Sequence, residues 1–144
     1  TFYQYFESTD ALFRTLALDA GRTMADLVDV FPAEPDGALD EWLVEWFDAY
    51  RSNGGVISAW QEIDPGDPAM AAMSLELMVV FFDRLARAVH TRGFGDTDVD
   101  AISLLAVIER VPYTVVVLHD LDEAPALAAA HHLIARGILG RGVD

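Results

Sequence analysis

The sequence predicts an all-α fold, and three observations support this prediction. Apolar residues recur at spacings of three and four through most of the chain, which is the period of a helix that buries one face. No segment alternates convincingly between apolar and polar residues, as a half-buried strand would. Short clusters of proline, glycine and aspartate separate the periodic segments. With 53% hydrophobic residues among 144, the chain can bury a substantial core.

Six helices are expected. They cover residues 8–30, 38–51, 56–63, 68–91, 98–118 and 123–138. The first begins at Ser8, a good N-cap residue, and places Asp10 at the positive end of the helix dipole. Pro32 ends this helix, and a loop rich in proline and glycine follows.

The second helix has the clearest amphipathic pattern. Its apolar stripe consists of Leu39, Trp42, Leu43, Trp46, Phe47 and Tyr50. Glu41 and Glu45 lie one turn apart on the opposite face, which indicates a solvated surface. Asn53, Gly54 and Gly55 are expected to break the helix before a short third one.

The remaining helices have recognisable signals. Asp67 and Pro68 predict the start of the fourth helix, with an aspartate N-cap and a proline in the first turn. Pro112 lies inside the fifth helix, where it should cause a kink and free the carbonyl of Ile108. This proline is either a plain structural kink or a bend that shapes a pocket. Small alanines in the sixth helix permit close helix packing.

Composition excludes several classes of function. The chain has no cysteine, so disulfides, thiolate catalysis and cysteine-based zinc sites are excluded. Its net charge of −15 argues against nucleic-acid binding by this part of the protein, because phosphates need cations. There is no phosphate-binding glycine loop, nucleophile elbow or Glu-x-x-His motif, so we expect neither an enzyme nor a cofactor. His131 and His132 point to different helix faces, which argues against a metal site.

The longest strongly apolar run covers residues 77–82. It is far shorter than the roughly 20 residues that a membrane-spanning helix needs. We therefore expect a soluble, cytoplasmic protein.

The first thirteen residues resemble a motif of the TetR family of transcription regulators. In that family, a motif like T-[LF]-Y-x-[HY]-F ends the DNA-reading helix, and S-K-[ED]-x-L-[FL] opens a long connecting helix. The matching residues are Thr1, Phe2, Tyr3, Tyr5, Phe6, Ser8, Asp10, Ala11, Leu12 and Phe13. Thr9 departs from the pattern, because the family usually has a lysine there that meets a DNA phosphate.

The resemblance implies a division of the chain. Residues 1–7 would be the end of a helix-turn-helix DNA-binding domain, most of which would precede Thr1, and residues 8–144 would be a ligand-binding and dimerisation domain. Thr1 and Tyr3 would touch DNA phosphates, while Phe2 and Phe6 would pack inside the DNA-binding domain. The last two helices of a TetR-type regulatory domain pair with a second subunit in a four-helix dimer interface. The corresponding residues here are Val115, Leu118, Leu127, Ala130, His131, Ile134 and Ile138.

Aromatic and methionine side chains indicate a ligand pocket. Large rings and flexible thioethers line pockets that accept varied apolar ligands, although each residue is equally consistent with an ordinary core. The candidates are Leu43, Trp46, Phe47, Tyr50, Trp60, Met78, Phe81, Phe82 and Tyr113. A resemblance to EthR-like members of the family, which share the FYxYF motif and a Glu-Arg pair on the fifth helix, adds Leu105 and Ile108. Glu109 is either a polar anchor at the pocket wall or half of an ordinary ion pair.

The function that the resemblance implies is transcription regulation. The protein would be a homodimeric repressor that a small apolar effector releases from double-stranded operator DNA. The first helix would be the lever between pocket and DNA, and a bulky substitution at Gly21 would change induction more than folding. Two alternatives stay open. One is an apolar-ligand carrier or small helical enzyme without DNA function, and the other is a purely structural dimerisation module with a filled core.

Overall fold

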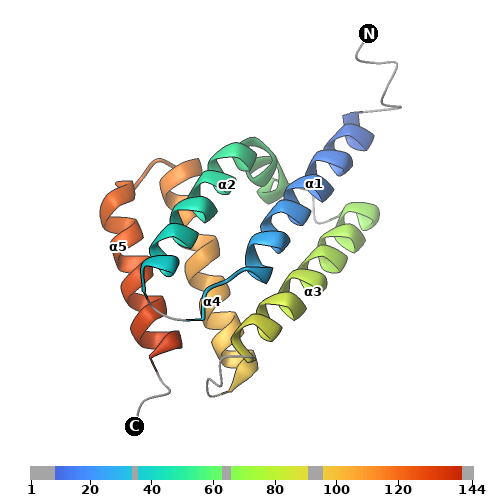
Figure 1. The fold of residues 1–144 in the computed structure, drawn as a ribbon. Coiled ribbons are helices and arrows are strands. Elements are labelled where there is room, and N and C mark those ends of the chain that lie inside the picture. Colours follow the sequence, from blue (N-terminus) through green and yellow to red (C-terminus); the bar gives the residue numbers. More distant parts are fainter. Residues whose placement is uncertain (1–8, 34–35, 63–65, 91–95, 141–144) are drawn as a thin grey trace.

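A computed structural model describes residues 9–33, 36–62, 66–90 and 96–140, and within these ranges it contains five α-helices and no strand (Figure 1). The helices are α1 (Thr9–Asp29), α2 (Gly37–Gln61), α3 (Pro68–His90), α4 (Thr97–Pro112) and α5 (Glu123–Leu133). Short π-helical segments, Tyr113–Val117 and Ile134–Leu139, extend α4 and α5. The predicted all-α class is confirmed.

The prediction of six helices was wrong, because the expected second and third helices form one continuous helix, α2. Asn53 does not break it; its side-chain amide donates to the carbonyl of Ala49 at 2.8 Å within the same helix. Each glycine in a helix interior costs about 1 kcal/mol relative to alanine. Packing beyond the glycines offsets this cost. Ile57 packs against the core, and the Trp60 ring lies 6.3 Å from the Phe13 ring of α1.

Aspartate side chains start three of the helices. Asp36 accepts from the amide of Ala38 at 2.9 Å at the start of α2. Asp67 accepts from the first-turn amides of α3 at 2.9 and 3.1 Å, which confirms the predicted start at Asp67 and Pro68. Asp96 does the same for α4 at 3.1 and 3.3 Å. These bonds satisfy amides that have no partner within the helix. The predicted cap at Ser8 lies outside the described residues.

The helices form a bundle in which α2 and α4 lie between α3 on one side and α5 on the other (Figure 1). Helix α1 packs against both α2 and α3. The indole of Trp42 donates to the carbonyl of Leu27 at 2.8 Å and so ties α2 to α1. Arg84 of α3 pairs with Asp26 and Asp29 of α1 at 3.3 and 3.0 Å. The C-terminal end of α1 is thus attached to both α2 and α3.

Pro112 frees the backbone carbonyl of Ile108 from its helical hydrogen bond, as the sequence predicted. Proline has no amide hydrogen, so the Ile108 carbonyl loses its helical donor. The indole of Trp46 takes that place, donating to the Ile108 carbonyl at 2.7 Å across the core. Immediately after Pro112 the helix widens into the π-helical segment Tyr113–Val117, where the amide of Leu118 donates to the carbonyl of Tyr113 at 3.1 Å.

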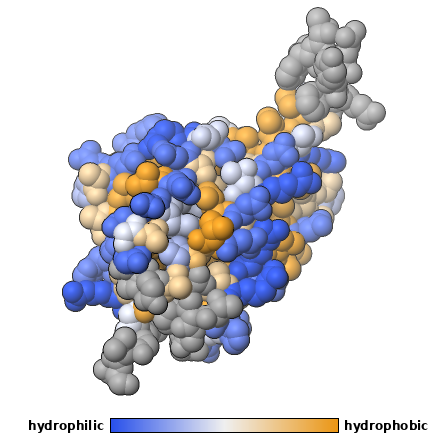
Figure 2. Space-filling model, viewed as in Figure 1, coloured by the Kyte–Doolittle hydropathy of each residue, from blue (hydrophilic) through white to orange (hydrophobic). Residues whose placement is uncertain are grey.

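The face of the molecule seen in Figure 2 is largely hydrophilic, with smaller apolar areas between the hydrophilic residues. None of the helices in the described ranges is both long and apolar enough to cross a membrane.

Candidate ligand cavity

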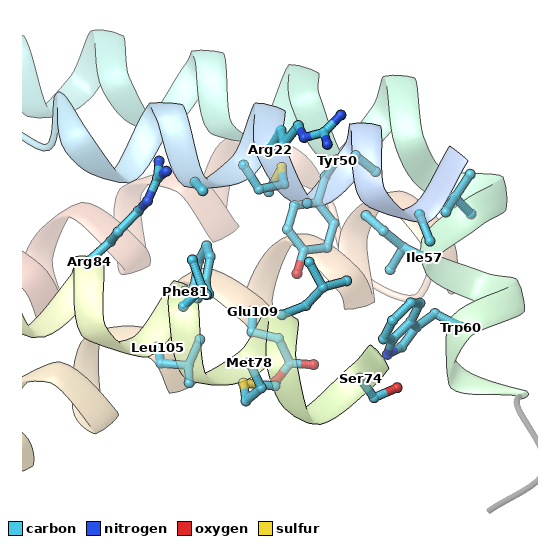
Figure 3. Close-up of a pocket in the computed structure, with 18 of the residues that line it drawn as sticks. Arg22, Tyr50, Ile57, Trp60, Ser74, Met78, Phe81, Arg84, Leu105 and Glu109 are labelled. Atoms are coloured by element: carbon cyan, nitrogen blue, oxygen red, sulfur yellow. The ribbon is translucent and has the colours of Figure 1, made fainter. Parts of the chain in front are cut away.

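A cavity of about 300 Å³ lies between α1, α2, α3 and α4 (Figure 3). Its lining is mainly apolar and aromatic, and each of the four helices contributes at least one polar side chain. Met78 and Val80 of α3 line it and are about half exposed, so a ligand has a route from the surface along α3. Apolar cavities with a small number of polar groups are typical small-molecule sites. The alternative of a purely structural dimerisation module predicts a filled core without such a cavity.

Seven of the residues predicted for the pocket line the cavity. They are Trp46, Tyr50, Trp60, Met78, Phe81, Leu105 and Glu109. Leu43, Phe47 and Ile108 are instead buried in the core, and Phe82 and Tyr113 pack partly buried against it. The difference arises because α2 is surrounded by other helices on more than one side. A stripe of apolar residues therefore predicts burial, but it does not distinguish a packed neighbour from an empty space.

The sequence-based prediction of the pocket did not include any residue of α1. Its lining positions are Ala17, Ala20, Gly21, Arg22, Met24 and Ala25. The signal was present in the sequence, because four of these six residues are alanine or glycine on one face of the helix. Small side chains on a buried face leave space where leucine or phenylalanine would fill it. Val56, Ile57, Gln61, Ser74, Leu77, Val80 and Arg84 are further lining residues that the sequence reasoning did not include.

The aromatic wall of the cavity is held in place by contacts on its far side. The Trp46 ring stacks on Trp42, with centroids 5.0 Å apart and an interplanar angle of 19°. On the cavity side it meets Tyr50 at 6.1 Å and Phe81 at 6.2 Å, both tilted. Its indole nitrogen is fixed by the Ile108 carbonyl. The ring at the centre of the wall is therefore preorganised.

Tyr50 provides a neutral polar group inside this wall. Its side chain is 5% exposed, and its hydroxyl projects into the space between the helices (Figure 3). Burial raises the pKa of Tyr50 well above its usual range, and the nearby Glu109 carboxylate raises it further, while Arg110 acts in the opposite direction. Within the described part of the chain, no residue forms a hydrogen bond with this hydroxyl. It stays protonated and is available to a ligand.

Three ionisable side chains besides Tyr50 line the cavity, and they differ in how closely an oppositely charged side chain approaches them. Arg84 pairs with two aspartates of α1, and Arg22 pairs with Asp19 at 3.3 Å. Glu109 has its nearest cationic partner in Arg110, at 3.9 Å and adjacent in the chain. The Arg110 guanidinium lies over the Tyr113 ring, 5.3 Å from its centroid. Glu109 is thus the least compensated charge of the three.

The residues predicted for a dimer interface mostly face the core of the chain itself. Val115, Ala130, Ile134 and Ile138 are buried, and Leu127 packs partly buried against the same core. His131 lies beside Asp40 of α2, with its Nδ1 2.7 Å from the carboxylate. Only Leu118 of the predicted set is exposed. The reason is that α5 packs against α2 and α4, so its apolar face is already buried within the chain's own helix bundle.

Two further predictions concern the DNA-contacting residues and the absence of a metal site. Thr1 and Tyr3, the predicted phosphate contacts, lie outside the described residues. In the described ranges, no group of three or more histidine, aspartate or glutamate side chains is placed so that it could hold a metal ion.

Comparisons with protein-family models, curated proteins and solved structures found no match to this chain. Its class is therefore defined by its own fold and site: an α-helical bundle with an apolar, aromatic cavity between its first four helices.

The raised pKa of Tyr50 predicts how stability depends on alkaline pH. An ordinary tyrosine ionises at about pH 10, so above that pH the unfolded chain loses a proton that the folded protein keeps. Stability should then fall with rising pH, by up to about 1.4 kcal/mol per pH unit, whereas below about pH 10 Tyr50 contributes no pH dependence. Urea unfolding across this range measures the slope. Tyr50→Phe should reduce it, with Tyr113→Phe as the matched control. An unchanged slope in Tyr50→Phe would contradict the prediction.

Proposed function

We propose that this chain is the ligand-binding and dimerisation part of a TetR-like transcription regulator, acting as a repressor that an effector releases from operator DNA. The observation that carries the proposal is the position of α1. Helix α1 begins at Thr9, two positions after the segment 1–7 that resembles the end of a DNA-binding domain, and its second half lines the cavity. One rigid element thus joins the proposed DNA-binding end to the proposed ligand site.

The proposed mechanism uses α1 as a lever. A ligand in the cavity contacts α1 from Ala17 to Ala25, while the ion pairs of Arg84 hold the end of α1 against α3. A ligand that favours one tilt of α1 would alter the spacing of two DNA-reading helices in a dimer, and that spacing must fit adjacent major grooves. The ligand acts only to the extent that it binds the two arrangements with different affinity.

The proposal also requires a dimer, and its surface must differ from the buried residues named above. The outward side of α5 is available, because Ala128, Ala129, His132 and Leu133 are exposed there. Leu118 and Leu121 extend this apolar surface at the connection before α5. In the proposed four-helix interface these residues meet their counterparts in a second copy, while Ile134 and Ile138 support α5 from within.

DNA binding by the natural full-length polypeptide tests the proposal. We expect it to bind a fragment from upstream of its own gene with salt-dependent affinity, and to lose that affinity when a cavity ligand is added. Fluorescence anisotropy of labelled DNA measures both effects, with an unrelated fragment of equal length as the control. A polypeptide that binds ligands in the cavity and never shifts its own DNA would favour the carrier alternative.

Gly21 offers a variant that separates ligand response from folding. It lines the cavity, and an added Cβ would lie 3.3 Å from Cδ2 of Leu77, the movable end of a side chain. Gly21→Trp should therefore place its ring in the cavity, retain DNA binding and lower ligand affinity at least about tenfold, because occupied volume excludes the ligand. Gly21→Ala is the control: it should keep the ligand response and gain up to about 1 kcal/mol in helix propensity. Unaltered ligand response in Gly21→Trp would show that the effector does not use this cavity.

A further inference from the structure

The charges that line the cavity indicate which class of ligand it binds. This inference rests on the proposed function, because it takes the cavity to be the effector site. Three charged side chains line the cavity: Arg22, Arg84 and Glu109. Both arginines already have carboxylate partners on α1, at 3.0–3.3 Å. Neither therefore offers an uncompensated positive charge to an anionic ligand.

Glu109 differs from the arginines in its partner. Arg110 follows it directly in α4, and adjacent helical residues point in different directions. Their closest approach is 3.9 Å, and Arg110 is simultaneously held over the Tyr113 ring outside the cavity lining. The carboxylate thus adds negative charge to a space that is otherwise mostly apolar. A charge in such surroundings is stabilised by an opposite charge that the ligand supplies.

The other cavity walls suit a cation as well. Trp46, Tyr50, Trp60 and Phe81 present aromatic rings to the cavity, and the faces of such rings attract ammonium groups. The Tyr50 hydroxyl projects into the same space and can accept a hydrogen bond from an N–H group (Figure 3). The thioether of Met78 adds a flexible apolar contact beside them.

We propose that the cavity binds amphiphilic organic cations, with the ammonium group beside the Glu109 carboxylate and the Tyr50 hydroxyl, and the apolar body against Trp46, Trp60 and Phe81. This narrows the expected effector from apolar molecules in general to apolar molecules that bear one amine or ammonium group. The Glu109 side chain is partly exposed, so the ammonium group of the ligand would be near solvent. Leu77 and Leu105, which also line the cavity, would contact the apolar body of the ligand.

Binding of three probes with the same alkyl chain tests the proposal: octylammonium, octanol and octanoate. Isothermal titration calorimetry gives the dissociation constants, and tryptophan fluorescence reports occupancy because Trp46 and Trp60 line the cavity. We expect octylammonium to bind about tenfold more tightly than octanol, and octanoate to bind most weakly. Equal affinity of the wild-type protein for octylammonium and octanol would overturn the proposal, and so would failure of all three to bind.

Two charge-neutralising variants test whether the Glu109 carboxylate causes the preference for octylammonium. Glu109→Gln should remove most of the preference for octylammonium and leave octanol affinity within about twofold. Glu45→Gln makes the same change on the exposed face of α2 and should preserve the preference. An equal loss in both variants would mean that the acidic surface attracts the cation, and would overturn the proposal. Thermal unfolding of each variant checks folding, and the wild-type probe series decides the matter if Glu109→Gln does not fold.

The outcome for the ligand and the outcome for the proposed function can be told apart. If octylammonium binds selectively and the full-length polypeptide never binds its upstream DNA, the ligand inference holds and the regulator proposal fails. If octanol releases the DNA and octylammonium does not, the regulator proposal holds and the ligand inference fails.

Discussion

Replacing Phe47 with alanine is expected to lower the free energy of unfolding by about 3–5 kcal/mol, since truncating a buried phenylalanine removes its apolar contacts and leaves a void. Phe47 is 1% exposed and belongs to the core cluster, away from the cavity lining. Chemical denaturation of wild type and variant measures the difference. A cost below about 1 kcal/mol would mean that this side chain is not packed in the core.

Two matched variants sharpen this result. Val44→Ala truncates a side chain on the same helix that is 48% exposed, and it should cost well under about 1 kcal/mol. Phe81→Ala removes a phenylalanine that lines the cavity and is only partly buried. It should cost less stability than Phe47→Ala and change ligand affinity more. The reverse order would place the ligand against Phe47, as the sequence suggested.

Replacing Trp46 with phenylalanine is expected to cost about 1–3 kcal/mol, because the buried Ile108 carbonyl loses the indole donor at 2.7 Å. Pro112 cannot supply a backbone donor to that carbonyl. Pro112→Ala would introduce an amide at the position from which a helix normally donates to Ile108. The cost of Trp46→Phe should therefore be smaller by about 1 kcal/mol in the Pro112→Ala background.

A double-mutant cycle measured by urea unfolding tests this coupling. Trp42→Phe is the matched control, since that indole donates to the Leu27 carbonyl at 2.8 Å and has no connection to Pro112. Its cost should be the same in both backgrounds. An equal cost of Trp46→Phe with and without the proline would show that the indole does not compensate for the missing amide.

The sequence by itself determined several local features of this protein. The all-α class follows from apolar residues at helical spacing, and the start of α3 follows from Asp67 and Pro68, because both signals depend only on neighbouring residues. The freed carbonyl of Ile108 was predictable for the same reason, since proline removes a donor wherever it lies in a helix. That Trp46 would supply the replacement was not, because the two residues are 62 positions apart.

Only the tertiary structure decided which buried residues meet a packed neighbour and which meet a cavity. Trp46 and Phe47 are adjacent in one apolar stripe, yet one lines the cavity and the other lies in the core. The continuity of α2 through Gly54 and Gly55 was decided in the same way, by contacts that Trp60 makes with α1. The helical spacing of apolar residues predicts that a side chain is buried on folding. What it then contacts depends on residues distant in the chain, and these become neighbours only when the helices pack.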